Sequence, residues 1–332
     1  MTRLVCIALL FAPLQFAADP ALPAGAKPKN EGSVGAGEGP VWHPSGNLYF
    51  SGRNRITRRD AAGGIHIFRE PSGSNGLLFD LQGRLVVCES GGRRIARTEP
   101  DGSITVLAEG FEGKRFNTPN DLTMDSRGRI YFTDPRYGNR DDMEMRDGQG
   151  RLIEGVYRID APGKVARIVT HEVDRPNGIL VSPKDEFLYI ADNNNNTVGG
   201  ARKLWRFGLK PDGTIDAASR KLIFDWENGR GPDGVKMDRK GRLYVAGGLN
   251  KPHPPYESAD KFKGGVYILS PEGKLLDFIA IPVDEVTNCA FGGADLKTLF
   301  ITAGGTLWSI PVTTPGRIPF TDPQPLPPVA AR

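Results

Sequence analysis

The chain has 332 residues, with 43 Lys and Arg against 39 Asp and Glu and a formal net charge of +4. Hydrophobic residues make up 39% and charged residues 25%, which excludes a disordered chain, and the interspersed acidic residues exclude a basic nucleic-acid footprint. The 42 Gly and 27 Pro residues favour many short strands and turns over long helices.

The first 26 residues are typical of a secretory signal peptide. Arg3 precedes an apolar run from Leu4 to Ala18, which is too short to cross a bilayer comfortably. Small residues follow, and Ala24-Gly25-Ala26 fits the small-x-small cleavage pattern, with Ala17-Ala18 as a weaker alternative. We therefore expect a secreted or periplasmic protein, a single domain over residues 27–332 and no membrane span once the signal is removed.

One pattern recurs six times along the rest of the chain. Each copy has a polar lead residue, an apolar strand, a turn and a second apolar strand, and another strand pair follows. The lead residues are Glu38, Asn75, Asn120, Asn177, Asp233 and Asn288. Four short strands per repeat are the composition of a propeller blade. The sequence therefore predicts an all-β fold, a six-bladed β-propeller with four-stranded blades and a Pro-rich C-terminal tail.

Propeller topology brings the six lead residues to one place. Each begins the innermost strand of its blade, so all six lie at one end of the central channel. The loops between the second and third strands hang over that same end, and the longest run from Pro135 to Glu154, Asn193 to Lys203 and Gly247 to Gly264. Long loops over a fixed group of side chains are where function usually lies.

The chemistry of the lead residues predicts a site for a hard cation. They offer two carboxylates and four amides, and Ca²⁺ takes 6–8 oxygen ligands of this kind. No His or Cys stands in the ring, which disfavours a zinc or copper site. We expect Ca²⁺, with Mg²⁺, Mn²⁺ and Zn²⁺ as alternatives. Turn formation is the other explanation of the Asn-Gly and Asp-Gly pairs, but Glu38 is no turn residue.

An ordered set of motifs resembles the SMP-30/gluconolactonase/LRE-like family of six-bladed propellers, which is related to diisopropyl-fluorophosphatase. The resemblance runs from Glu38 to about Trp308. The motifs are Glu38-Gly39-Pro40-Val41-Trp42, Pro119-Asn120-Asp121, the segment from Tyr131 to Gly138, Arg175-Pro176-Asn177-Gly178, Gly231-Pro232-Asp233-Gly234 and the segment from Thr287 to Gly293.

The resemblance implies a metal-dependent hydrolase of small lactones or related esters. It implies that Glu38, Asn177 and Asp233 bind the divalent metal. Asn120 and Asp233 are then the catalytic candidates, with Asp233 as general base, nucleophile or a ligand that only orients water. Animal members of the family carry an Arg where this chain has Thr118, so their preference for acidic or polyhydroxy substrates is not implied.

Four further residues are candidates for substrate binding beside Asn120. Asp134 and Tyr137 lie at the end of a strand and the start of its loop, and Asn75 and Asn288 complete the ring. A non-catalytic propeller, which binds Ca²⁺ for stability and a ligand or protein at the channel, is the alternative function. The oligomeric state stays open.

The cysteines give little evidence of oxidative cross-linking or metal binding. Beyond the signal region the chain keeps Cys88 and Cys289, both in apolar strand-like settings. A disulfide between them is an open alternative, and buried free thiols are the interpretation that we favour.

Overall fold

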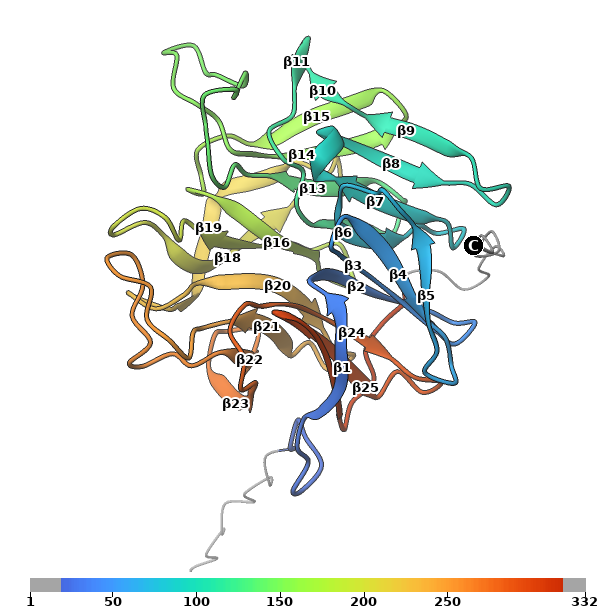
Figure 1. The fold of residues 1–332 in the computed structure, drawn as a ribbon. Helices are drawn as coiled ribbons and strands as arrows, with labels where there is room; N and C mark the ends of the chain where they lie inside the picture. The colour runs from blue at the N-terminus through green and yellow to red at the C-terminus, as the bar shows by residue number, and fades with distance from the viewer. Residues whose placement is uncertain (1–18, 319–332) are drawn as a thin grey trace, which may run out of the picture.

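The computed structural model describes residues 19–318 and confirms the six-bladed β-propeller (Figure 1). Six four-stranded sheets surround a central channel, and the described residues contain no α-helix, only the 3₁₀ turn η1 (Ser90–Gly92). No helix in residues 19–318 is therefore long and apolar enough to cross a membrane. The apolar run of the predicted signal peptide and the tail beyond residue 318 lie outside the described residues.

Each blade is an antiparallel sheet, and in the first five blades the strands run in chain order from the channel outward. The first blade comprises β2 (Glu38–His43), β3 (Asn47–Gly52), β4 (Arg55–Arg59) and β5 (Ile65–Arg69). The second comprises β6 (Ser74–Phe79), β7 (Leu85–Glu89), β8 (Arg94–Thr98) and β9 (Ile104–Ala108). A short hairpin, β10 (Gly110–Phe111) with β11 (Lys114–Arg115), leads to the third blade. The third blade comprises β12 (Leu122–Met124), β13 (Ile130–Asp134), β14 (Gly155–Ala161) and β15 (Lys164–Val169). The fourth comprises β16 (Pro176–Val181), β17 (Phe187–Asn193), β18 (Arg202–Leu209) and β19 (Ile215–Asp225).

The last blade closes the ring with strands from both ends of the described chain. The fifth blade comprises β20 (Pro232–Met237), β21 (Leu243–Gly247), β22 (Gly265–Leu269) and β23 (Leu275–Ala280). The sixth comprises β24 (Val286–Gly292), β25 (Thr298–Ala303), β26 (Gly305–Pro311) and β1 (Lys29–Ala36). Strand β1 pairs antiparallel with β26, so the N-terminal strand is the outer strand of the final sheet and joins it to the first blade.

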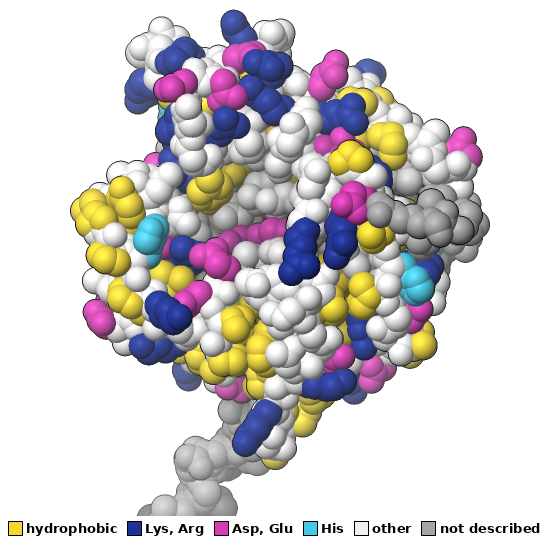
Figure 2. Space-filling model, viewed as in Figure 1, with side chains coloured by type: hydrophobic (Ala, Val, Ile, Leu, Met, Phe, Trp, Pro, Cys, Tyr) yellow, Lys and Arg dark blue, Asp and Glu magenta, His cyan; other side chains and the backbone are white. Residues whose placement is uncertain are grey.

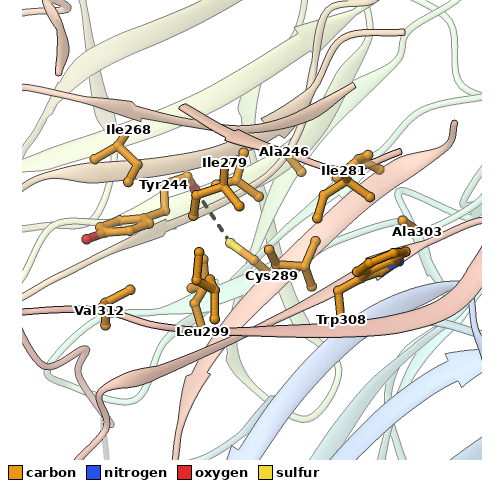
Figure 3. Packing of buried hydrophobic residues seen from close by; sticks show 14 of the residues in the cluster. Tyr244, Ala246, Ile268, Ile279, Ile281, Cys289, Leu299, Ala303, Trp308 and Val312 are labelled. Carbon is orange, nitrogen blue, oxygen red and sulfur yellow. Dashed lines mark hydrogen bonds between the residues drawn. The ribbon is translucent and has the colours of Figure 1, made fainter. Parts of the chain in front are cut away.

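Apolar side chains between neighbouring blades form the core. Figure 3 shows one such cluster, where Tyr244 and Ile268 of the fifth blade pack with Cys289 and Leu299 of the sixth. Cys289 and Cys88 are both buried and unpaired, which confirms the free thiols that the sequence favoured.

Residues 20–26 belong to this packed body. Ala21 is only 4% exposed and lies in the core cluster of the fifth and sixth blades, and Leu22 and Ala26 pack against the same cluster. The Ala21 carbonyl also accepts a hydrogen bond of 3.0 Å from the Thr313 amide. The chain segment directly after residue 18 is therefore part of the propeller wall.

A β-bulge lies near the start of the innermost strand in most blades and changes which side chains face the channel beyond it. The register shifts in five of the six innermost strands, for example between Glu38 and Val41 and between Pro232 and Val235. The extra residue of a bulge re-aims the side chains beyond it. In all six blades the residues three positions after the lead residues line a channel cavity of about 170 Å³; these residues, the second ring, are Val41, Leu78, Thr123, Leu180, Lys236 and Phe291.

Glycine follows the lead residue in four blades because the neighbouring blade leaves no room for a side chain. A Cβ on Gly178 would lie 2.1 Å from the Asp233 carbonyl oxygen, and one on Gly234 would lie 2.1 Å from the Asn288 carboxamide. Of the four, only Gly39 has a positive φ, at 52°. Close packing around the channel, and not turn formation, therefore explains these Asn-Gly and Asp-Gly pairs.

The three long loops lie where the sequence placed them. They comprise residues 135–154 between β13 and β14, residues 194–201 between β17 and β18, and residues 248–264 between β21 and β22. Each leaves its blade at the end of the channel where the lead residues stand, which we call the channel mouth.

Candidate functional site

The lead ring, which comprises the six lead residues, gathers at the channel mouth as predicted. Asn288 Nδ2 lies 3.4 Å from Glu38 Oε2 although the two residues are 250 positions apart in the chain. The Gly76 amide donates a 2.7 Å hydrogen bond to the Asn120 carbonyl, which joins the second and third blades. Figure 2 shows a hollow at the centre of this face with acidic side chains gathered inside it.

Free oxygens of three lead residues form the candidate metal centre. Glu38 Oε2 accepts hydrogen bonds from the Gly39 amide and from Asn288, but Glu38 Oε1 accepts none from residues 19–318. Asn177 uses only its Nδ2, which donates to Tyr137, and neither carboxylate oxygen of Asp233 has a hydrogen-bond partner in this part of the chain. Unsatisfied carboxylate and amide oxygens are the ligands that a hard cation requires.

The electrostatics of the mouth also fit a cation. Burial, together with the nearby Asp121 carboxylate, raises the pKa of Glu38 to about 7. Burial and the Glu38 charge likewise hold the pKa of Asp233 well above its ordinary value. A bound divalent ion would relieve the repulsion that acts on the Glu38 and Asp233 carboxylates. Within residues 19–318 no three His, Cys, Asp or Glu side chains converge closely enough to hold an ion, so the set needs the Asn177 amide.

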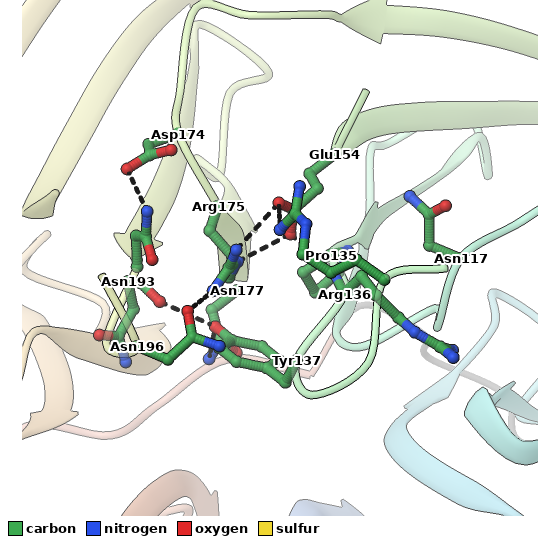
Figure 4. A network of polar contacts seen from close by, with 12 residues as sticks. Asn117, Pro135, Arg136, Tyr137, Glu154, Asp174, Arg175, Asn177, Asn193 and Asn196 are labelled. Carbon is green, nitrogen blue, oxygen red and sulfur yellow. Dashed lines mark hydrogen bonds and ion pairs between the residues drawn. The ribbon is translucent and has the colours of Figure 1, made fainter. Parts of the chain in front are cut away.

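A polar network from the third and fourth blades holds Asn177 in place (Figure 4). The Tyr137 hydroxyl accepts a 3.0 Å hydrogen bond from Asn177 Nδ2 and donates one of 3.1 Å to the Asn193 carbonyl. Arg175 lies over the Tyr137 ring at 5.4 Å from its centroid and forms an ion pair of 2.8 Å with Glu154. The orientation of the Asn177 oxygen is therefore set by a loop residue, Tyr137.

Asn288 positions other groups instead of facing a ligand. Its Nδ2 donates to Glu38 Oε2 and, at 3.3 Å, to Asp121 Oδ2. Its Oδ1 accepts from Lys236 Nζ at 3.1 Å and from the Cys289 amide at 2.9 Å. These four bonds use the full capacity of a carboxamide. Asn288 therefore orients Glu38, its neighbour in the lead ring.

The other predicted site residues differ in whether their side chains have hydrogen-bond partners within the protein. The Asn75 carboxamide oxygen is buried without a partner, and the Asn120 carboxamide makes no hydrogen bond with residues 19–318, so both are available to a ligand. Asp134 is fully buried, and its carboxylate accepts a 2.8 Å bond from the Asn117 amide, so it holds that segment in place. Thr118 donates its hydroxyl to the Pro135 carbonyl at 2.6 Å.

Sequence reasoning missed two charged residues of the site, Asp121 and Lys236. Asp121 was part of a motif but was not counted as a charge, although it stands where four other blades have glycine. Lys236 Nζ lies 3.8 Å from Asp121 Oδ2. The signal that could have found it is its place three positions after a lead residue, where the other blades have apolar residues or threonine.

Comparison with known proteins places this chain in a family. The sequence profile of the SMP-30/Gluconolactonase/LRE-like region matches residues 36–305. The chain belongs to this family. A gluconolactonase of Zymomonas mobilis is 31% identical over 292 residues, which cover 80% of this chain and 75% of the relative. A 6-deoxy-6-sulfogluconolactonase of Pseudomonas putida is 31% identical over 277 residues, which cover 80% of this chain and 82% of that protein.

Solved structures of family members have the same fold. A gluconolactonase from Xanthomonas campestris superposes with a TM-score of 0.72 at 29% identity, over 88% of this chain and 91% of that one. A calcium-binding regucalcin from Agrobacterium tumefaciens has a TM-score of 0.69 at 19% identity, over 92% and 98% of the two chains. At that identity the likeness to regucalcin extends to the fold alone.

Proposed function

We propose that the protein hydrolyses sugar lactones and that Glu38, Asn177 and Asp233 hold the divalent metal this requires, with Ca²⁺ as the first candidate. The observation that carries the proposal is the set of unpartnered oxygens that these residues present at the mouth. The gluconolactonase names of the relatives support the substrate class.

The residues of the mouth have separate tasks in this mechanism. A bound divalent cation supplies Lewis-acid polarisation of the lactone carbonyl. Asp233 accepts the proton of the attacking water, a task for which its carboxylate oxygens are free because they have no hydrogen-bond partner in residues 19–318. Asn120 and Asn75 offer free carboxamides to the substrate, while Tyr137 and Asn288 keep the metal-holding side chains in orientation.

Hydrolysis of the lactone ring requires one bond to form, one bond to break and one proton to be transferred through Asp233. The water oxygen bonds to the carbonyl carbon as its proton passes to Asp233. The bond between that carbon and the ring oxygen then breaks, and the proton moves from Asp233 to the departing oxygen. The product is the open hydroxy acid, which releases one proton to solution at neutral pH.

Proton release measures this reaction directly. The purified protein is incubated with δ-gluconolactone, a γ-lactone of a five-carbon sugar and an aliphatic lactone, before and after EDTA treatment. We expect turnover of the sugar lactones, loss on chelation and recovery with Ca²⁺. Metal-dependent folding without turnover of any lactone or ester would instead support the non-catalytic propeller.

We propose that the protein is exported and that the signal peptide is cleaved after Ala18. The packing of Ala21, Leu22 and Ala26 against the propeller supports this site, because cleavage after Ala26 would remove apolar side chains from the core. N-terminal sequencing of protein recovered from the periplasm or medium tests it. The sequence should begin at Asp19, and a chain that begins at Lys27 would contradict the proposal.

A further inference from the structure

The second ring of the channel contains one charged residue, Lys236. The other five second-ring positions carry apolar side chains or Thr123. Lys236 Nζ donates a 3.1 Å hydrogen bond to Asn288 Oδ1 and lies 3.8 Å from Asp121 Oδ2. Its side chain is 26% exposed and lines the channel cavity. The ammonium group therefore lies in the channel directly beneath the lead ring.

The charges around this ammonium leave an excess of negative charge. Within residues 19–318, Lys236 supplies the only cationic group within 4 Å of the Asp121 carboxylate. Glu38, Asp121 and Asp233 carry three negative charges when ionised, and Lys236 carries one positive charge, so a single divalent ion neutralises the remainder. Arg230 also acts on Asp233, but its guanidinium is paired with Glu257 at 2.9 Å and with Glu285 at 2.6 Å.

Lys236 also connects to the proposed metal centre through hydrogen bonds. Its Nζ fixes Asn288 Oδ1, and the other end of that carboxamide bonds Glu38 Oε2 and Asp121 Oδ2. Without the ammonium, Asn288 Oδ1 would lose an N–H donor and Asp121 would become a buried carboxylate with no compensating cation. Such a pair of oxygens next to Glu38 is the start of a second cation site.

We propose that Lys236 is a tethered cation that compensates Asp121 and limits the channel to one divalent ion, held by Glu38, Asn177 and Asp233. This inference rests on the proposed metal centre. Lys236 is thus a positioning residue that takes the place of a second ion beneath the site.

Lys236→Met tests the inference, since it keeps the length of the side chain and removes its charge. We measure the midpoint of thermal unfolding in EDTA and in Ca²⁺, and the Ca²⁺ dissociation constant by titration. In EDTA the midpoint should fall by several degrees, and Ca²⁺ should restore most of that loss. The Ca²⁺ affinity should rise roughly tenfold or more, because a positive charge near the ion has been removed.

Two variants and a count of bound ions serve as controls. Lys240→Met deletes an exposed lysine just beyond the same strand and should change neither midpoint nor affinity. Lys236→Arg keeps the charge and should keep the wild-type response to EDTA. Native mass spectrometry should find one tightly bound Ca²⁺ in the wild-type chain.

Several results would overturn the role of Lys236. These are two tightly bound ions in the wild type, a midpoint loss in Lys236→Met that is equal with and without Ca²⁺, or failure of that variant to fold in saturating Ca²⁺. None of these measurements uses turnover. A protein that binds one ion but hydrolyses no lactone therefore contradicts the proposed function and leaves the role of Lys236 intact.

Discussion

The two ends of the propeller channel are built from the same six strands, but their carboxylates differ in whether they have partners within the protein. At the mouth, Asp233 has no hydrogen bond from residues 19–318 and Glu38 has one free oxygen. At the far end, three of the innermost strands are followed directly by Asp80, Asp125 and Asp238, and each pairs with the Arg four positions later at 2.8, 2.6 and 2.6 Å. The difference is therefore one of partners and not of residue type.

This contrast separates stability from chemistry. Asp125 also accepts bonds from backbone amides and from the Tyr131 hydroxyl at 3.0 Å, so its charge is fully used within the fold. The oxygens at the mouth are left for a ligand, and Asn288 donates hydrogen bonds to two of the carboxylates there. Paired substitutions at the two ends should therefore have opposite effects on turnover and stability.

The largest effect should come from the two aspartates at opposite ends of β20. Asp233→Asn removes the proton acceptor and a metal-holding charge, so turnover should fall about 10³-fold. The midpoint in EDTA should stay equal or rise, because a buried repulsion is lost. Steady-state kinetics and thermal unfolding measure both effects.

Asp238→Asn is the matched control. It leaves Arg242 without its carboxylate partner, which should cost about 3 kcal/mol of unfolding free energy while turnover by the folded fraction stays within about twofold. Equal losses of turnover in the two variants would show that the site assignment is wrong.

Glycine substitutions should give the next largest effect. In Gly178→Ala the new Cβ would lie 2.1 Å from the Asp233 carbonyl oxygen, so the strand that carries Asp233 must move. Overpacking of this kind costs about 1–3 kcal/mol, and the displacement should lower turnover at least about tenfold. Gly163→Ala, at an open turn with φ +75°, should cost about 1 kcal/mol and leave turnover unchanged. Denaturant unfolding measures the loss of stability in each variant, and kcat measures the loss of turnover.

The pH dependence of stability should also distinguish the carboxylates of the mouth from those of the far end. The pKa of Glu38 is raised from 4.5 to about 7, so in EDTA the folded state holds a proton that the unfolded state releases. That contribution is complete below pH 4.5 and is lost as the pH rises to about 7. Burial also raises the pKa of Asp134 to about 8, with the same sign but no link to metal.

The response of the unfolding midpoint to Ca²⁺ isolates the part of the pH dependence that is linked to metal binding. The increase in unfolding midpoint on addition of Ca²⁺ should be small at about pH 5 and grow through about pH 7 as Glu38 and Asp233 ionise. Thermal unfolding in EDTA and in Ca²⁺ across this range provides the measurement. An increase that does not vary with pH would argue against these carboxylates as ligands.

The sequence repeat was sufficient to predict the six blades, the lead ring and the three long loops, because each copy has the same strand pattern and the same polar start. It was not sufficient for Lys236. In a regular strand the second residue after a lead residue shares its face, whereas the bulge brings the third residue to the channel. The contacts of Tyr137 could not be predicted either, because a loop has no period that would orient its side chains.

The smallest predicted effect concerns that tyrosine. Tyr137→Phe removes the acceptor of the Asn177 Nδ2 bond and the donor to the Asn193 carbonyl. Asn177 would then lose the side-chain contact that fixes its carboxamide. We expect Ca²⁺ affinity and turnover to fall together by about fivefold, the equivalent of one hydrogen bond of about 1 kcal/mol. Calcium titration and kinetics on the same preparation test this.

Tyr131→Phe at the far end removes a hydroxyl of similar geometry, 3.0 Å from Asp125. It should lower the unfolding free energy by about 1 kcal/mol without altering Ca²⁺ affinity, because Asp125 keeps its bonds to Arg129. If both tyrosine variants lost only stability, Tyr137 would be a structural residue like Tyr131, and the Asn177 oxygen would have to be oriented by its strand alone.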